Sequence, residues 1–255
     1  MFNCLKKKKY KRDESRIATP EIKSPAVVPG DEIVVDKELN PKVKLWYPDR
    51  AAYGGPNSFT RGTYENNYPI GATIHYSAGT NDPRNLLQYA VKQGYTFFVI
   101  DRDGNVFQNF PLNEWGYHCG KSKWPGLGDK SLNNKLVGIE CISAGHLSWR
   151  EDLKHTSWWG QVIPGEEVRE IPRDIGNIKK GSYHKFSELQ ETGLTKLCMW
   201  LKKNNPEIFN LEYVLGHSEI SAGRKQDPGG ALSMSMVEFR EKLIENYTLD
   251  RFNNN

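Results

Sequence analysis

Apolar and polar residues alternate in regular patterns only from about residue 68 onward, so the sequence predicts that the folded core begins there. Before that point charged residues, prolines and glycines prevail with little periodicity. Within the patterned region, short apolar runs bounded by turn residues are typical of buried strands. Strands are expected over 69–76, 96–100, 106–110, 136–142 and 212–216.

Start and stop signals indicate three helices between these runs. Asp82 before Pro83 is typical of a helix N-terminus, and Gly94 ends that segment. Two further helices open with a capping box, a Ser followed three residues later by Gln or Glu, at Ser187 with Gln190 and at Ser235 with Glu238. The first of these is expected to present its leucines on one face, at Leu189, Leu194, Leu197 and Leu201; the second is expected to run through Leu243.

The element order β-α-β-β-β-α-β-α predicts an α/β fold with a central mixed β-sheet flanked by helices. We expect residues 1–67 to form a charged tail and linker, 68–248 to form the domain, and 249–255 to form a C-terminal tail. The segment 145–183 is rich in Trp, Gly, Pro and charge and is interpreted as a long insertion. Loops of that length inside a compact domain are usually functional or mobile.

Composition narrows the class of protein. The chain has 255 residues and a formal net charge of +4, and no apolar run approaches the ~20 residues that a membrane span needs. Its first residues lack the apolar stretch of a secretory signal, so we expect none. The basic run at 6–12 is either a solvated tail or a tether to an anionic surface such as nucleic acid, lipid or wall polymer. The four cysteines are scattered without a CxxC pair, which favours reduced thiols.

Candidate metal ligands follow two of the expected strands. His217 and Asp227 lie ten residues apart, and His75 ends the first strand. Imidazole and carboxylate are good zinc ligands, and strand ends collect functional groups in sheets of this kind. Two histidines and one carboxylate leave a fourth position for water, whose pKa zinc lowers to about 7. The set therefore predicts a catalytic zinc site.

Two further residues fit the same chemistry. Glu140 lies on an otherwise apolar strand, where burial should raise its pKa and suit it to carry a proton from water to a leaving amine. Lys225 precedes Asp227 by two residues and is placed to stabilise a developing oxyanion. Together these residues predict a metal-assisted hydrolase acting on an amide or an ester.

Each of these residues also has a structural interpretation. A single histidine such as His75 is more often a hydrogen-bonded structural residue than a ligand. Asp227, followed by Pro228 and Gly229, is most simply a turn residue. Glu140 could be buried because it forms an ion pair, with Lys225 as a candidate partner. Their joint occurrence favours the functional interpretation.

Several motifs, taken in order, carry a resemblance to a known family. They are Ala72–Ser77, Phe98–Gly104, Asn133–Glu140, Gly216–Ile220 and Gly223–Gly229, with Trp115–Gly120 similar to a Trp-His-Ala-Gly segment. In this order and spacing the chain resembles the zinc-dependent N-acetylmuramoyl-L-alanine amidases. That group includes bacteriophage lysins, bacterial wall-recycling amidases and animal peptidoglycan recognition proteins. The resemblance spans about residues 68–246.

The resemblance implies an amidase fold, a substrate and roles for named residues. The implied reaction hydrolyses the amide bond between the lactyl group of N-acetylmuramic acid and L-alanine, so the expected partner is peptidoglycan or a muropeptide. The implied zinc ligands are His75, His217 and Asp227, and the implied catalytic residues are Glu140 and Lys225. The residues mapped to the substrate groove are His118, Asn133 and Arg224, the last as a bidentate partner for a stem-peptide carboxylate.

The chain departs from the family pattern in two places. Some relatives carry Tyr-His just before the hairpin strand, whereas here Thr96 and Phe97 occupy those positions and Tyr95 comes one residue early. A family branch with Asp as the third ligand pairs zinc with a glutamate, so this chain is expected to rely on Glu140. The insertion is also long for the family. Its tryptophans either stack on sugar rings or pack the loop: Trp149, Trp158 and Trp159.

Two alternatives to a free enzyme stay open. One is a muropeptide-binding module that has kept the fold and lost most of its catalysis. The other is a particle-bound component that pierces the wall, with residues 1–67 as its anchor. We expect a monomer with no nucleic-acid partner and no transmembrane segment. We also expect a phage-encoded lysin, made in the host cytoplasm or associated with a virion, that acts on the cell wall.

Overall fold

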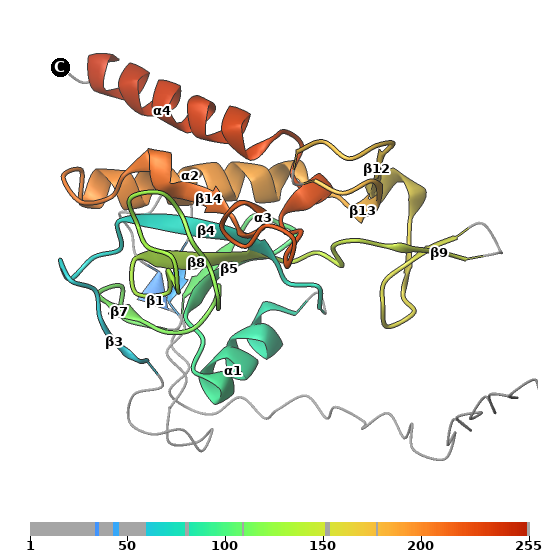
Figure 1. The fold of residues 1–255 in the computed structure, drawn as a ribbon, viewed down its shortest axis with the longest axis horizontal. Helices are drawn as coiled ribbons and strands as arrows, with labels where there is room; N and C mark the ends of the chain where they lie inside the picture. The colour runs from blue at the N-terminus through green and yellow to red at the C-terminus, as the bar shows by residue number, and fades with distance from the viewer. Residues whose placement is uncertain are drawn as a thin grey trace, which may run out of the picture.

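A seven-stranded mixed sheet forms the centre of the molecule (Figure 1). The computed structural model describes residues 34–35, 43–45, 60–79, 82–108, 110–150, 154–176 and 178–253. In spatial order the strands are β1 (Val34–Val35), β2 (Val43–Leu45), β6 (Val106–Gln108), β5 (Phe97–Ile100), β8 (Leu136–Cys141), β4 (Gly71–Tyr76) and β14 (Val214–Gly216). Strands β5, β8, β4 and β14 are parallel, and β6 is antiparallel to β5. The predicted α/β class with a mixed sheet is confirmed.

Helices cover both faces of this sheet. Helices α2 (Glu188–Asn204) and α4 (Met236–Asn253) lie on one face, and α1 (Pro83–Gln93) lies on the other (Figure 1). Successive side chains of a strand point to opposite faces. In β5, Phe98 and Ile100 therefore join the core cluster under α2 and α4, while Phe97 and Val99 pack with buried residues of α1.

The same alternation places two candidate site residues on one face. In β4, Ala72 and Ile74 belong to the core under α2 and α4. His75, the next residue, therefore points to the face that carries α1. Glu140 of β8 is the direct register partner of His75 and points the same way. The sheet thus puts a histidine and a carboxyl group side by side at the carboxyl ends of two parallel strands.

The predicted helix ends are present in the structure. Asp82 caps α1 by accepting from the Arg84 backbone N–H, and Gly94 ends that helix with a left-handed φ of 73°. Both predicted capping boxes form, at Ser187 with Gln190 and at Ser235 with Glu238. Helix α4 continues to Asn253, so residues 249–253 are helical rather than part of a tail.

One predicted helix face needs correction. Leu189 does not share the buried face of α2; its side chain is 57% exposed. Gln190 takes the buried position instead, and its amide donates to the carbonyls of Ile100 and Ile142 at the ends of β5 and β8. Gly193 keeps that face close to the sheet, because a Cβ there would lie 2.7 Å from the Gly104 carbonyl oxygen.

The segment 145–183, expected as a loop, folds into two small sheets of its own. Strand β10 (Lys154–Thr156) pairs with β9 (Ser148–Arg150) and β11 (Val162–Ile163), and β12 (Val168–Ile171) pairs with β13 (Gly181–His184). Glu167 joins this segment to the core by accepting from Arg102 at 3.0 Å, and it also accepts from His184 of β13 at 2.8 Å. The insertion is therefore a structured part of the domain.

Several short elements were not predicted. Strands β1 and β2 fall within residues 1–67 and extend the sheet beyond β6. Also within that range, β3 (Gly62–Thr63) pairs with β7 (Glu114–Trp115). The short helix α3 (His217–Ile220) follows β14, and three 3-10 turns occur at Gly165–Glu167, Leu211–Tyr213 and Gly229–Ala231. The basic run at 6–12 lies outside the described residues.

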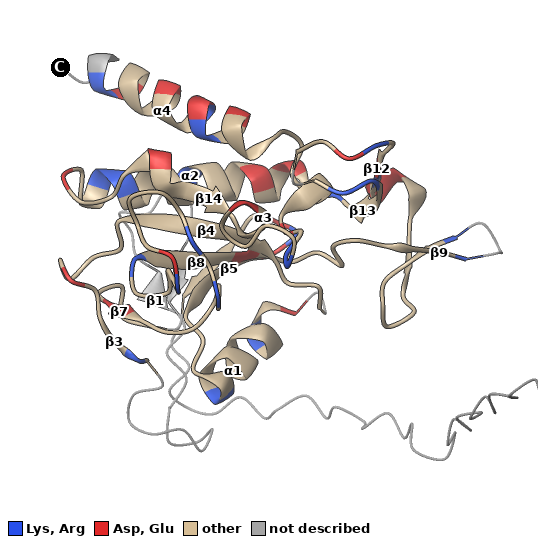
Figure 2. Ribbon diagram, in the orientation of Figure 1, with Lys and Arg blue, Asp and Glu red and all other residues tan. Residues whose placement is uncertain are grey.

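Charged residues lie mainly around the sheet rather than in it. Figure 2 shows acidic and basic positions interspersed along α4, whereas the central strands are largely uncharged. Among the described cysteines, Cys119, Cys141 and Cys198 are buried and free of disulfides. In the described part of the chain, no helix combines the length and apolar character that crossing a bilayer requires.

Candidate metal centre and its pocket

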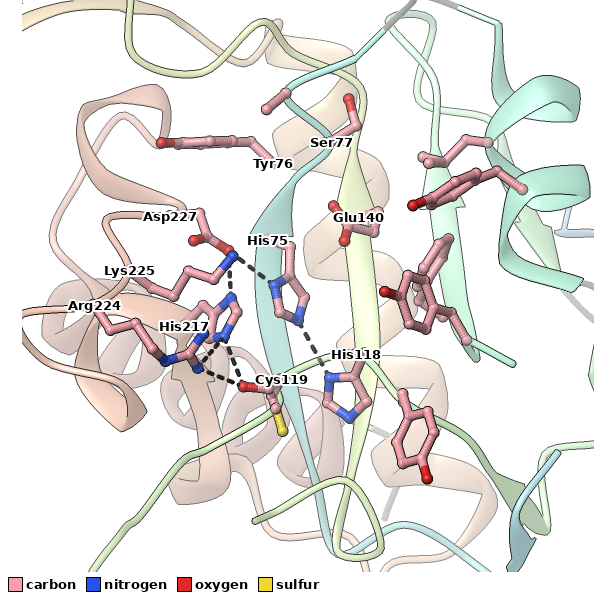
Figure 3. A pocket seen from close by; sticks show the side chains of 17 residues that line it. His75, Tyr76, Ser77, His118, Cys119, Glu140, His217, Arg224, Lys225 and Asp227 are labelled. Atoms are coloured by element: carbon pink, nitrogen blue, oxygen red, sulfur yellow. Dashed lines mark hydrogen bonds and ion pairs between the residues drawn. The ribbon is translucent and has the colours of Figure 1, made fainter. Parts of the chain in front are cut away.

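Three predicted ligands converge at the carboxyl ends of β4 and β14 (Figure 3). His75 is the fifth residue of β4, and His217 opens α3 directly after β14, the parallel neighbour of β4. Asp227 lies on the loop that follows α3. Its Oδ2 is 2.8 Å from His75 Nδ1 and 2.9 Å from His217 Nδ1, and all three side chains are buried.

The contacts from His75 to His118, and from His118 to the Leu136 carbonyl, determine which ring nitrogen of His75 carries the proton. The Leu136 carbonyl can only accept, so the contact of 2.8 Å requires His118 to carry its proton on Nε2. His118 Nδ1 is then an acceptor, and it lies 3.3 Å from His75 Nε2. His75 must therefore donate from Nε2, which leaves a lone pair on Nδ1 facing Asp227.

A similar constraint acts on His217. Its Nε2 lies 3.0 Å from the Cys119 carbonyl oxygen, which again only accepts. Arg224 Nη2 is also 3.3 Å from this nitrogen, but the carbonyl is its nearer partner. With the proton on Nε2, Nδ1 of His217 presents a lone pair to the same carboxylate oxygen of Asp227.

Three electron-pair donors thus face one another with no proton to share, an arrangement that a cation between them stabilises. A histidine that ligates a metal usually donates its other ring N–H to a carbonyl or a similar acceptor, as His75 and His217 do here. Burial, and next the neighbouring His217, lowers the pKa of His75 to about 4. Two imidazoles and one carboxylate therefore fit a divalent metal of the zinc class.

Asp227 is held in its charged form. Burial alone would raise its pKa, but the contacts of its Oδ2 with His217 and His75 outweigh that effect and keep the pKa below its usual range. Its backbone carbonyl accepts from the Ser218 N–H at 2.7 Å, so the residue also closes the turn, as its Pro-Gly neighbours suggested. The structural and the functional interpretations of Asp227 are both compatible with the fold.

Glu140 lies beside the ligand set without a partner for one oxygen. Its Oε2 is buried and makes no hydrogen bond in the described part of the chain. Burial, and next the charge of Asp227, raises the pKa of Glu140 to about 8, while Lys225 opposes the shift. No ion pair joins Glu140 to Lys225 among the described residues. A carboxyl group with this pKa can gain or lose a proton near neutral pH.

A pocket of about 540 Å³ opens over these groups, and its two sides differ in chemistry. Lys225 and Arg224 lie on one side (Figure 3). Aromatic and apolar side chains from α1, from β5, from the segment between them and from the segment after β7 also line the pocket, at Leu86, Tyr89, Tyr95, Phe97 and Tyr117. In the sequence, Tyr95 and Phe97 stood out only as departures from the family pattern and were not placed at a pocket, because strand and helix patterns do not reveal which aromatic residues border a cavity.

The remaining predicted site residues have different surroundings. His118 lines the pocket with both ring nitrogens engaged. Asn133 lies beneath the pocket and is not part of its lining; its Oδ1 accepts from the backbone N–H groups of His118 and Cys119, at 2.9 Å each. Arg224 lines the pocket, but its Nη2 lies 2.7 Å from the carbonyl oxygens of Cys119 and Lys121. Asn133 and Arg224 therefore hold the segment that carries Cys119.

Comparisons with known proteins add the following findings. The family model described as N-acetylmuramoyl-L-alanine amidase matches residues 65–230. A search of curated proteins found no match. Similar solved structures include the endolysin amidase LysCS from Clostridium intestinale URNW, with 17% identity, coverage of 73% of this chain and 90% of that one, and a TM-score of 0.42.

Two other solved structures are also similar to this chain. A mutant endolysin from Bacillus subtilis has 19% identity, coverage of 79% of this chain and 99% of that one, and a TM-score of 0.46. The amidase AmiD from E. coli, in complex with anhydro-N-acetylmuramic acid-L-Ala-D-γ-Glu-L-Lys, has 18% identity and a TM-score of 0.44. That comparison covers 70% of this chain and 58% of AmiD.

Proposed function

The chain belongs to the N-acetylmuramoyl-L-alanine amidase family, whose reaction is hydrolysis of the amide between N-acetylmuramic acid and L-alanine in peptidoglycan, and we propose that it performs this reaction with zinc. The observation that carries the proposal is the convergence of lone pairs from His75, His217 and Asp227 at one point. Two histidines and one carboxylate form a set that leaves room for a fourth ligand on zinc.

When bound there, zinc polarises the substrate carbonyl and lowers the pKa of water to about 7. Glu140 supplies the proton transfers on the protein side. In its ionised form it accepts a proton from the attacking water, and it then donates that proton to the departing amine of L-alanine. A pKa near 8 suits both steps, since the two forms of the group are close in free energy at neutral pH.

Lys225 and the residues on the two sides of the pocket are placed to contact the substrate. The Lys225 ammonium lowers the pKa of Glu140 and of His75, so its charge acts across the space where the scissile bond would lie. It is suited to stabilise negative charge that develops on the carbonyl oxygen. The aromatic side offers apolar contact for a sugar. Any nitrogen of Arg224 not bonded to Cys119 or Lys121 is available for a peptide carboxylate.

An enzyme explains the geometry better than a binding module does. A module that only binds muropeptides has no use for a buried carboxyl group whose oxygen has no partner in the part of the chain that the structure describes, because such a group costs free energy to maintain. We therefore propose a bacteriolytic enzyme, of the phage-lysin or bacterial kind, that acts as a monomer on the cell wall. Peptidoglycan or a muropeptide derived from it is the proposed substrate.

Product analysis tests this function directly. The full-length chain, loaded with zinc, is incubated with purified peptidoglycan, and the new ends are identified by mass spectrometry. We expect free lactyl carboxyl groups together with L-alanine amino termini. His217→Ala should release neither, whereas His146→Ala, a change at an exposed histidine outside the pocket, should act as the wild type. Cleavage by His217→Ala, or ends of another kind, would refute the proposal.

A further inference from the structure

An exposed tryptophan on the turn between β10 and β11 contacts a residue that lines the pocket. The side chain of Trp158 is 74% exposed. Its neighbour Trp159 turns inward and packs against the small apolar cluster of the insertion, formed by Ala144, Leu147 and Ile163. Adjacent tryptophans thus have opposite roles: Trp159 anchors the turn, and Trp158 is presented to solvent.

The exposed indole is nevertheless held in one place. Its Nε1–H donates to the Ala78 carbonyl at 2.7 Å, and its ring meets Trp159 edge to face with centroids 5.5 Å apart. The turn is closed by Ser157, whose N–H donates to the Gln161 carbonyl and whose Oγ accepts from the Gln161 N–H. An aromatic side chain fixed in this way loses little conformational entropy when it binds a ligand.

The contact with Ala78 joins the turn to the pocket. Ala78 follows β4, where His75 lies, and it forms part of the pocket lining. Elsewhere in the insertion, Glu167 accepts from Arg102 of the core and from His184 of β13. The insertion is thus fixed to the core at Glu167 and at this turn, which places Trp158 beside Ala78 of the pocket lining.

The chemistry of this surface favours one kind of ligand. The only polar group of the indole, its N–H, is already used on Ala78. What Trp158 offers is an apolar aromatic surface, and surfaces of this kind mark binding sites when they adjoin a functional pocket. The C–H-rich face of a pyranose ring is a flat apolar surface that matches it, and peptidoglycan is a polymer of such rings.

We propose that Trp158 is a sugar-binding platform that takes a saccharide of the glycan strand adjacent to the muramic acid in the pocket. The proposal rests on the proposed function, because the pocket must hold the sugar that carries the scissile amide. It adds a substrate preference to that function. A glycan polymer reaches Trp158, whereas a muropeptide with a single sugar does not.

Two substitutions separate the ring from its hydrogen bond. Trp158→Phe keeps an aromatic ring and loses the donor to Ala78, whereas Trp158→Gln keeps a donor and loses the ring. Binding of the full-length protein to insoluble purified peptidoglycan is measured by sedimentation in the presence of a chelator, so that no cleavage occurs. We expect Trp158→Gln to weaken binding about two- to tenfold and Trp158→Phe to retain most of it. Trp149→Ala, which removes another exposed tryptophan of the insertion, is the matched control and should bind as the wild type.

A second readout uses the zinc-loaded enzyme. For Trp158→Gln, kcat/KM should fall on polymeric peptidoglycan and stay unchanged on a muropeptide with one sugar. The proposal is overturned if kcat/KM falls equally on both substrates or on neither. It is also overturned if Trp158→Phe binds peptidoglycan more weakly than Trp158→Gln, because binding would then depend on the hydrogen bond rather than on the ring. Failure of the proposed function looks different: the wild type would sediment with peptidoglycan, through Trp158, and release no lactyl ends.

Discussion

The carboxyl group of Glu140 is held next to the three proposed ligands at a cost in stability, since its Oε2 is buried with no partner among the described residues. Replacement by Gln keeps the shape of the side chain and removes its ability to take up a proton. We expect Glu140→Gln to lower kcat about 10²–10⁴-fold, the usual contribution of a general acid or base. Zinc content, measured on the same preparation, should stay at the wild-type level. Unchanged kcat would eliminate the proton-transfer role.

His118 acts on the metal site through His75 rather than by direct contact with Asp227. Its ring links the Leu136 carbonyl to His75 Nε2 and thereby selects the tautomer that leaves Nδ1 free. We expect His118→Phe to weaken zinc binding about 10- to 100-fold, the effect typical of losing a partner that orients a ligand. Competition with a chromophoric chelator measures this affinity. The control is His146→Phe, and equal affinities for both variants would contradict the positioning role.

At the scale of single residues, the cluster of proposed ligands could be predicted from the sequence, but the hydrogen bonds that orient it could not. His75 and His217 lie at the ends of predicted strands, and Asp227 follows at a spacing that a loop can close, so the clustering of these three residues could be expected, and their binding of zinc stays a proposal. The role of His118 depends on where the Leu136 carbonyl points. Asn133 was expected at the substrate groove and instead binds backbone N–H groups beneath it. Such contacts arise from tertiary packing, which leaves no local signal.

At the scale of elements, the insertion is joined to the core by a neutral histidine. His184 Nδ1 accepts from the Ala144 N–H at 3.0 Å, and Nε2 donates to Glu167 at 2.8 Å. Burial lowers the pKa of His184 below that of an exposed histidine, an effect that Glu167 only partly offsets. The unfolded chain therefore takes up a proton as the pH falls through about 6.5, while the folded chain does not until a lower pH.

This linkage predicts that stability is lost on the acid side. The contribution of His184 is fully present above about pH 6.5 and declines as the pH falls toward its folded pKa. We expect His184→Gln to flatten the decline in the free energy of unfolding between about pH 7.5 and 5.5. Urea denaturation with a chelator present measures the free energy of unfolding at each pH. The histidines of the proposed metal site contribute to the wild type and to the variant alike, so the difference between the two isolates the contribution of His184. The exposed His146→Gln should keep the wild-type slope; a wild-type slope in His184→Gln would contradict the linkage.

The helices were predictable because their ends carry local chemistry, as the caps at Asp82 and Ser187 illustrate. The strands of the insertion were not. Each is four residues or shorter, and all three residues of β9 are exposed, so no apolar run distinguishes these strands from a loop. Leu189 was misplaced for a related reason, since a buried Gln at position 190 does not register in a search for apolar periodicity.

At the scale of the whole molecule, strand order is what the sequence could not provide. The apolar pattern predicted that β4, β5 and β8 are buried, but pairing depends on contacts between residues far apart in the chain. The clearest case is β2, which lies within the segment expected as tail and linker and pairs in parallel with β6. The domain boundary expected at residue 68 therefore excludes two strands of the central sheet.

Truncation tests where the folded unit begins. Removing residues 1–33 leaves β1 and β2 in place, so we expect the melting temperature and amidase activity of the full chain. Removing 1–59 takes both strands away and exposes the backbone groups of β6 that pair with Val43–Leu45. An uncovered edge strand destabilises a sheet and favours aggregation. We therefore expect a lower melting temperature and light scattering that grows with concentration, while kcat of the remaining monomer is kept because the site lies at β4 and β14. If removal of 1–59 leaves the melting temperature unchanged, β1 and β2 contribute nothing to stability and the boundary near residue 68 is correct.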